Sequence, residues 1–353
     1  MTTEALVLAA VSVVTIAFVA LTIGGSSGGA SYGPAVGSGV LTVRQAGALM
    51  ALSALAGSFV AGLPVVETVG EEFVPAETFT ITAALVVSVL TGIGILIGNL
   101  RGVPISTSQV AISAITGMGI ALGVLNWETF GRVVVWWIVA PVVSFWLAAV
   151  AGRYLYEGVV ATLALEDGSR VRVVRALVVT IACYMAFSAG ASNMANAVAP
   201  LVSAGTIPVL PALAVGGVAM GVGVVVFGSR TVETVGKNIA EIPLEAALIV
   251  EVIAATIITT LSLAGVPVSL VITVVTAVIG LGWGRSTRHL TRLQQFGFGE
   301  VTEEDYRTLE TDSDGLFDVE TVRTVVVLWL VVPVAIGALS LGLFLLLGAL
   351  QIV

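Results

Sequence analysis

The pentapeptide Val66-Glu67-Thr68-Val69-Gly70 occurs twice in this chain, and its second copy is Val232-Glu233-Thr234-Val235-Gly236. The two copies are 166 residues apart, and at the same offset Pro34, Val36, Gly39 and Val43 match Pro200, Val202, Gly205 and Val209. Gly102-Val103-Pro104-Ile105-Ser106 matches Gly265-Val266-Pro267-Val268-Ser269 at 163, and Val139-Ala140-Pro141-Val142 matches Val331-Val332-Pro333-Val334 at 192. These matches predict two copies of one unit, at residues 1–152 and 173–353, joined by a linker at 153–172.

The composition is that of a protein embedded in a lipid bilayer. Hydrophobic residues make up 58% of the 353 residues and charged residues only 10%, against about a quarter charged in an ordinary soluble domain. The 40 glycines fit this setting, because membrane helices pack closely through small residues. A soluble fold is excluded. We expect the bilayer as the surroundings, no nucleic-acid partner, and either a monomer or a homo-oligomer.

Ten apolar runs approach the ~20 residues that a helix needs to cross a bilayer. They are residues 5–24, 46–63, 78–99, 104–125 and 133–152 in the first copy, and 173–190, 211–227, 245–263, 267–283 and 324–353 in the second. Five is an odd number, so the second copy enters the membrane inverted. Inverted repeats are typical of secondary transporters, although a duplicated bundle without a transport role is the alternative. The predicted fold class is an all-α polytopic membrane protein of two inverted five-span repeats with broken or re-entrant helices.

The basic residues predict the orientation of these spans. With both termini extracellular, 13 of the 14 Lys and Arg residues fall in cytoplasmic loops and only Arg132 lies outside. Such asymmetry agrees with the positive-inside rule and indicates a multi-pass protein of the cell membrane. The net charge of −8 arises largely from a cytoplasmic loop at 284–322, which we interpret as a solvated acidic segment.

Two Gly/Ser/Asn-rich segments, residues 24–39 and 190–205, follow the first span of each copy. We expect them to interrupt the helix, and non-helical backbone inside a membrane is tolerated only where it is buried in protein or lines a watery cavity. The segments therefore predict the substrate site. The candidate residues in them are Ser26, Ser27, Ser192, Asn193 and Asn196.

A second pair of matching segments, rich in hydroxyl residues in the first copy, begins at Pro104 and at its counterpart Pro267. Pro104 is followed by Ser106, Thr107, Ser108 and Gln109, whereas Pro267 is followed only by Ser269. A proline followed by hydroxyl residues predicts a helix start, whose free N–H groups and positive dipole end bind anions. The alternative is that these hydroxyls only cap their own helix.

Few residues are available for other chemistry. Cys183 is the only cysteine and His289 the only histidine, so thiolate clusters, histidine metal sites and catalytic triads are excluded. We expect no catalytic residue, no metal and no cofactor. Glu251 is the one carboxylate deep inside an apolar run, and such residues are functional candidates by default. It is the candidate for coupling to a proton or another cation, with a purely structural role as the alternative.

These motifs resemble those of the inorganic phosphate transporter family, the sodium- or proton-coupled phosphate permeases. The family signature, close to Gly-Ala-Asn-Asp-Val-Ala-Asn-Ala, is similar to Gly190-Ala191-Ser192-Asn193-Met194-Ala195-Asn196-Ala197. Its Pro-Val-Ser-Thr-Thr-His resembles Pro104-Ile105-Ser106-Thr107-Ser108-Gln109, and its Val-Glu-Thr-Ile-Gly-Lys resembles residues 232–237. The resemblance implies cation sites at the signature residues and phosphate at the Ser-Thr-Thr runs.

The chain departs from the family pattern in its charged positions. Ser27 and Asn193 stand where the family has aspartate, Ser26 and Ser192 where it has asparagine, and the second Ser-Thr-Thr is Ser269-Leu270-Val271. The missing aspartates favour a proton over sodium as the coupling ion. They also bear on the anion, because a site of donors alone suits sulfate, which carries no proton, whereas protonated phosphate gains from an acceptor. Secondary-active phosphate transport is thus expected, with a sulfate permease and a passive anion channel as alternatives.

The orientation can be tested by labelling. Cysteines introduced in the loop near Glu72 should react with an impermeant thiol reagent from outside, because that loop carries no basic residue. Cysteines near Arg288 should react only after permeabilisation. The reverse pattern would refute the topology.

Overall fold

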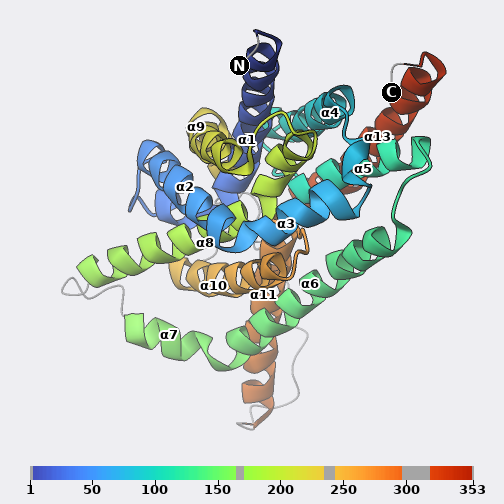
Figure 1. Cartoon of the computed structure of the whole chain (residues 1–353). Coiled ribbons are helices and arrows are strands. Elements are labelled where there is room, and N and C mark those ends of the chain that lie inside the picture. Colours follow the sequence, from blue (N-terminus) through green and yellow to red (C-terminus); the bar gives the residue numbers. More distant parts are fainter. Residues whose placement is uncertain (1–2, 164–170, 234–242, 296–318, 352–353) are drawn as a thin grey trace.

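The computed structural model describes residues 3–163, 171–233, 243–295 and 319–351, and this part of the chain is entirely helical apart from turns (Figure 1). The helices are α1 (Thr3–Gly37), α2 (Val43–Gly57), η1 (Ser58–Gly62), α3 (Leu63–Glu67), η2 (Thr68–Glu72), η3 (Ala76–Thr78), α4 (Ile81–Leu100), α5 (Thr107–Ala121), α6 (Trp127–Tyr154), α7 (Tyr156–Leu163), α8 (Val171–Ser203), α9 (Val209–Glu233), α10 (Leu244–Leu263), α11 (Leu270–Gln295) and α13 (Val319–Ala349). The prediction of an all-α polytopic membrane protein is confirmed.

The expected ten spans are not all present. Nine helices of the described residues are long and apolar enough to cross a membrane. The run at 104–125 instead contains α5, whose 15 residues give about 22 Å of helix against a hydrocarbon core of about 30 Å. The proline at its start does not begin the helix either, since Pro104 lies three residues before Thr107. The prediction of a tenth full span was wrong.

The predicted breaks at 24–39 and 190–205 were also wrong. Helix α1 runs unbroken to Gly37 and α8 to Ser203. Their glycines instead permit close helix crossing: a Cβ on Gly24 would lie 2.0 Å from the Met220 carbonyl oxygen in α9, and one on Gly190 would lie 2.0 Å from that of Ala54 in α2. A continuous helix also satisfies its own backbone hydrogen bonds, which the membrane interior demands.

The same crossings use a second pair of glycines. A Cβ on Gly57 would lie 1.9 Å from the Phe187 carbonyl oxygen, and one on Gly223 would lie 2.0 Å from that of Leu21. Gly24, Gly190, Gly57 and Gly223 thus form two equivalent crossings, α1 with α9 and α8 with α2, related by the offset of 166 found in the sequence. The inverted duplication stays a prediction, and these paired contacts support it.

The irregular backbone lies elsewhere in the fold. The second apolar run is divided into α2, η1, α3 and η2, with π-helical turns at Ser58–Gly62 and Thr68–Glu72. Pro64 lies between them and has no N–H to donate. Two further turns, residues 101–106 between α4 and α5 and residues 264–269 between α10 and α11, make each of these helix pairs a hairpin.

The two hairpin tips contact α1 and α8 well inside these long helices. Ser26, which contacts the first tip, precedes the end of α1 by 11 residues, or about 16 Å. Ser192, which contacts the second tip, precedes the end of α8 by the same number. The tips also touch each other, since Ser108 Oγ lies 3.3 Å from the Val268 carbonyl oxygen. Hairpins that spanned the bilayer from opposite sides, as the predicted inverted repeat requires, would hold their tips about 30 Å apart. The contact therefore indicates re-entrant hairpins, although α4, α10 and α11 are each long enough to cross.

A tryptophan from the opposite half fixes each tip. Trp137 of α6 donates its Nε1–H to the Pro267 carbonyl at 2.9 Å, and Trp329 of α13 donates to the Pro104 carbonyl at 2.9 Å. These indole N–H groups find partners in the protein, as buried tryptophans generally do. Each hairpin is therefore anchored by the half to which it does not belong.

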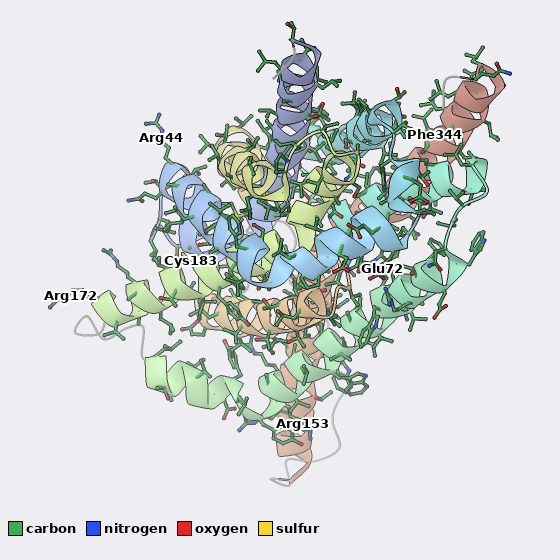
Figure 2. All side chains as sticks on the ribbon, viewed as in Figure 1. Arg44, Glu72, Arg153, Arg172, Cys183 and Phe344 are labelled. Atoms are coloured by element: carbon green, nitrogen blue, oxygen red, sulfur yellow. The ribbon has the colours of Figure 1, made fainter. Side chains whose placement is uncertain are left out.

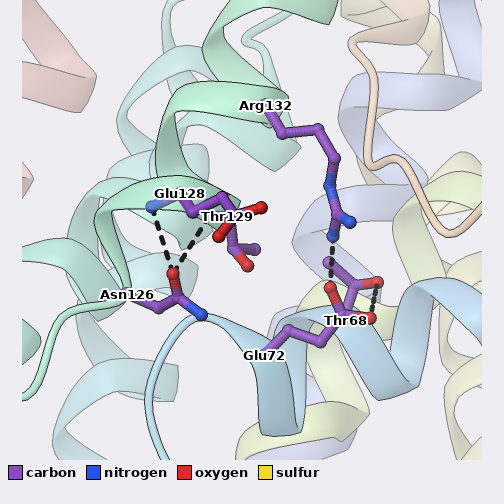
Figure 3. A network of polar contacts seen from close by, with 6 residues as sticks. All are labelled: Thr68, Glu72, Asn126, Glu128, Thr129 and Arg132. Atoms are coloured by element: carbon purple, nitrogen blue, oxygen red, sulfur yellow. Dashed lines mark hydrogen bonds and ion pairs between the residues drawn. The ribbon is translucent and has the colours of Figure 1, made fainter.

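Several labelled arginines lie at the margins of the molecule in Figure 2. Arg44, Arg153 and Arg172 lie along the left and lower margins of Figure 2, away from the chain ends marked in Figure 1. Arg132 pairs with Glu72, to which Thr68 also donates at 3.2 Å (Figure 3). Both members of this ion pair belong to the side that the sequence assigns to the exterior.

Parts of the predicted linker and of the predicted acidic loop are helical. The linker at 153–172 contains α7, and Arg288 of α11 pairs with Glu157 of that helix at 2.8 Å. Helix α11 continues to Gln295, so the first 12 residues of the predicted loop at 284–322 are helical. The acidic residues at 300–318 and the second copy of the repeated pentapeptide beyond Glu233 lie outside the described residues.

Candidate functional site

A serine of each long helix holds the backbone of a hairpin tip. Ser26 Oγ donates to the Ile105 carbonyl at 2.8 Å and accepts from the Ile105 N–H at 3.0 Å. Ser192 Oγ does the same for Val268, at 2.9 and 3.2 Å. Both hydroxyl protons are therefore engaged by backbone carbonyls. To donate to an anion, Ser26 and Ser192 would have to exchange these partners.

Four other predicted residues form one polar cluster between the tips. Ser108 Oγ lies 3.2 Å from Asn193 Oδ1, Asn193 Nδ2 donates to Ser27 Oγ at 3.4 Å, and Asn196 Nδ2 donates to Ser108 Oγ at 3.3 Å. All four side chains are at most 1% exposed. The structure thus brings together residues of α1, α5 and α8 that are up to 169 positions apart in the sequence.

Helix α5 points its first turn into this cluster. Ser106 caps the helix by accepting from the Gln109 N–H at 3.4 Å, which places Thr107 and Ser108 at the first two helical positions. N–H groups at these positions have no acceptor within the helix, and the helix dipole adds partial positive charge there. Thr107 is 4% exposed. The α5 start can therefore receive an anion without a basic side chain.

Helix α11 begins in the same way but with fewer hydroxyls. Ser269 caps it by accepting from the Ile272 N–H at 3.3 Å. Leu270 and Val271 occupy the positions that Thr107 and Ser108 hold in α5, so this second helix start offers backbone N–H groups alone. The two hairpins are alike in geometry, and the side-chain donors come from the first.

Gln109 lies beside the cluster rather than in it. Its Oε1 is buried without a hydrogen-bond partner among the described residues. A small pocket between α5, α6 and α11 is lined by Gln109, Trp137, Ser269 and Thr273 among others. Gln109 and Ser269 thus face a common space next to the hairpin tips.

Glu251 is buried in α10 with 3% exposure, and its Oε1 has no partner among the described residues. It precedes the end of α10 by 12 residues, about 18 Å along the helix, so it lies away from the cluster. Tyr32 is close enough to interact with it electrostatically and contacts Cys183 Sγ at 3.9 Å. Glu251 therefore belongs to a buried polar centre separate from the cluster.

The sequence interpretation missed several residues that build the site. Trp137 and Trp329 hold the tips, and Asn99 donates its Nδ2–H to the Thr22 carbonyl at 2.7 Å while its Oδ1 has no partner among the described residues. Asn99 had a detectable signal, because it is an amide at the end of an apolar helix just before a turn. The tryptophans had none, since aromatic residues are common in membrane helices.

A buried polar cluster between hairpin tips and long apolar helices is typical of membrane transporters. The profile of the phosphate transporter family matches residues 23–340 of the chain. The protein belongs to this family.

Individual relatives agree with this assignment. The chain is 28% identical over 273 residues to the sulfate permease CysP of Bacillus subtilis, covering 76% of this chain and 75% of that protein. It is 26% identical over 354 residues to a predicted phosphate permease of Pyrococcus furiosus, covering 76% and 86%. A solved structure described as "The sodium-dependent phosphate transporter" has the same fold, with a TM-score of 0.70 and 20% identity over 97% of this chain and 99% of that one.

The double hydrogen bond of Ser192 can be tested by Ser192→Ala. The change leaves the Val268 N–H without a partner in a buried setting and leaves its carbonyl with only the Ser108 hydroxyl at 3.3 Å, so it should destabilise the protein by about 1–3 kcal/mol. Thermal unfolding in detergent measures the effect. Ser12→Ala is the matched control, because Ser12 is also buried but donates only to Leu8 of its own helix. Equal unfolding temperatures for the two variants would contradict this role of Ser192.

Proposed function

We propose that this protein is a secondary-active transporter of inorganic phosphate. The observation that carries the proposal is the start of α5, where Thr107 and Ser108 join free backbone N–H groups inside a buried polar cluster. A tetrahedral oxyanion can be held there by donors alone, with the positive end of the helix dipole compensating part of its charge. Membership of the phosphate transporter family supports phosphate as the anion.

The proposed binding residues are the ten that the sequence indicated. Thr107, Ser108 and Asn193 would contact the anion first, because they lie at the α5 start or hydrogen-bond to it. Around them are Ser26, Ser27, Ser106, Gln109, Ser192, Asn196 and Ser269. None of these side chains carries a formal charge, so binding depends on hydrogen bonds and dipoles.

Sulfate is the second candidate anion. The similarity to the Bacillus subtilis sulfate permease favours it, as does the lack of a carboxylate in the cluster. A passive anion channel is a third possibility and would show flux without any coupling gradient. The carrier is better supported than the channel, because the four clustered side chains are almost completely buried between the hairpin tips.

For coupling we propose a proton carried by Glu251. The cluster residues Ser27 and Asn193 supply no negative charge for sodium, whereas Glu251 is buried with an unpartnered oxygen. Sodium is the alternative, and the name of the solved structure with this fold favours it. The location of Glu251 away from the cluster means that coupling would act through a conformational change rather than by contact with the anion.

We further propose that the protein lies in the cell membrane with both termini extracellular. The distribution of the basic residues along the sequence supports this orientation. With re-entrant hairpins, Arg101 moves from a cytoplasmic loop to the first hairpin tip. The side of every other basic residue is unchanged, because each hairpin returns to the surface from which it entered.

The anion site can be tested by Thr107→Ala. The substitution removes one donor to a desolvated anion, and should weaken phosphate binding by about 1.5–3 kcal/mol because a charge-assisted hydrogen bond is lost. Calorimetric titration of the purified protein measures the change. Thr91→Ala is the control, since Thr91 is equally buried but donates to Val87 of its own helix. Unchanged affinity in a folded Thr107→Ala protein would place the site elsewhere.

The coupling proposal can be tested by Glu251→Gln. We expect proteoliposomes to lose proton-driven uptake of radiolabelled phosphate while phosphate binding persists, because the amide cannot exchange a proton. Glu245→Gln, in the first turn of the same helix, should transport normally. Uptake that rises steeply with sodium at fixed pH, or normal uptake by Glu251→Gln, would refute this coupling model.

A further inference from the structure

Asn196 carries a buried oxygen with no partner beside the start of α5. Its side chain is 1% exposed, and its Nδ2 donates to Ser108 Oγ at 3.3 Å. Its Oδ1 accepts no hydrogen bond from any described residue. A buried acceptor left without a donor costs about 1–3 kcal/mol, so an unpaired oxygen at this place indicates that a ligand supplies the donor.

The neighbouring hydrogen bonds fix which way the amide points. The Ser108 hydroxyl has a single proton, and two acceptors already compete for it, Asn193 Oδ1 at 3.2 Å and the Val268 carbonyl at 3.3 Å. The amide group of Asn196 that faces Ser108 must therefore be the NH₂ donor. Turning the amide over would present a third acceptor to one proton. Oδ1 is thus held as a free acceptor at the site.

An acceptor distinguishes between the two candidate anions. Phosphate retains at least one proton at neutral pH, whereas sulfate and selenate retain none. We propose that Asn196 Oδ1 accepts a hydrogen bond from the P–OH group of bound phosphate and so selects protonated oxyanions against sulfate. This rests on the proposed anion site at α5 and assigns its selectivity to one atom. It also revises the expectation that a neutral site, being made of donors, favours sulfate.

A cation is the other ligand that could satisfy Oδ1. The location disfavours it, because Asn196 is bonded to Ser108 at the second position of α5. Unpaired N–H groups and the positive end of the helix dipole surround that position. A protonated anion instead matches both groups at once, with its charged oxygens on the N–H groups and its hydroxyl on Oδ1.

The test uses two anions of similar size that differ in protonation. Arsenate carries a proton at neutral pH as phosphate does, and selenate carries none as sulfate does. In the full-length protein, arsenate should displace radiolabelled phosphate at a concentration about tenfold or more below that of selenate, since the lone acceptor repels a fully ionised oxygen. Asn196→Ala should bring the two competitors to within about threefold of each other, mainly by weakening arsenate.

Two further variants keep the test decisive. Asn196→Asp retains the shape and the acceptor, so it should keep or increase the preference for arsenate even if Asn196→Ala does not fold. Ser88→Ala removes another buried polar atom without a partner among the described residues; Ser88 precedes the end of α4 by 12 residues and is not part of the cluster, so this variant should leave the preference unchanged.

The experiments distinguish a failure of the proposed function from a failure of the selectivity proposal. Absence of any oxyanion binding in the wild-type protein would refute the proposed function itself. Binding with an unchanged arsenate preference in Asn196→Ala, or a preference lost in Asn196→Asp, would overturn the selectivity role alone. If Asn196→Ala instead raises the sodium concentration needed for half-maximal phosphate binding and leaves the preference intact, Oδ1 is a cation ligand and the proposal is wrong.

Discussion

The fold depends on satisfying two stretches of irregular backbone at the centre of a membrane. Water is absent there, and each unpaired N–H or carbonyl group costs several kcal/mol. Ser26 and Ser192 meet this demand, because each hydroxyl donates to the carbonyl and accepts from the N–H of one residue of a hairpin tip. The tips can therefore end at half depth, and their helix starts can face a common polar cluster instead of lipid.

Close helix crossing places those serines where the tips can reach them. Gly24 and Gly190 let α1 and α8 approach the backbones of α9 and α2 to a distance that excludes even a methyl group. The cross-half bonds of Trp137 and Trp329 then join each tip to the opposite half. A movement of one half against the other would consequently act directly on the hairpin starts, which is how alternating access at a fixed midplane site operates.

The sequence correctly predicted the features that follow from residue composition, such as the apolar membrane helices. It was wrong about where those helices are interrupted. The apolar runs were long enough to identify the membrane helices, and the positions of Ser108, Asn193 and Asn196 were recognised as candidates before their contacts were known. The glycine-rich segments predict breaks, because glycine is a poor helix former in water. In this protein they are continuous helix, since a lipid-embedded chain forms backbone hydrogen bonds within the helix and uses glycine for contact.

The sequence by itself determined that the chain is a helical membrane protein, that motifs of its first half recur in its second half at offsets of 166, 163 and 192 residues, and that several polar residues lie within apolar segments. These properties are local, because hydrophobicity and spacing are carried by neighbouring residues. Tertiary structure alone decided that the hairpins stop at half depth, that Ser108 meets Asn193 and Asn196, that Glu251 stands apart, and that Asn196 Oδ1 is left free. Each of these features depends on which helices cross and on which acceptor receives a given hydroxyl proton. Both are decided by contacts between residues that are far apart in the chain.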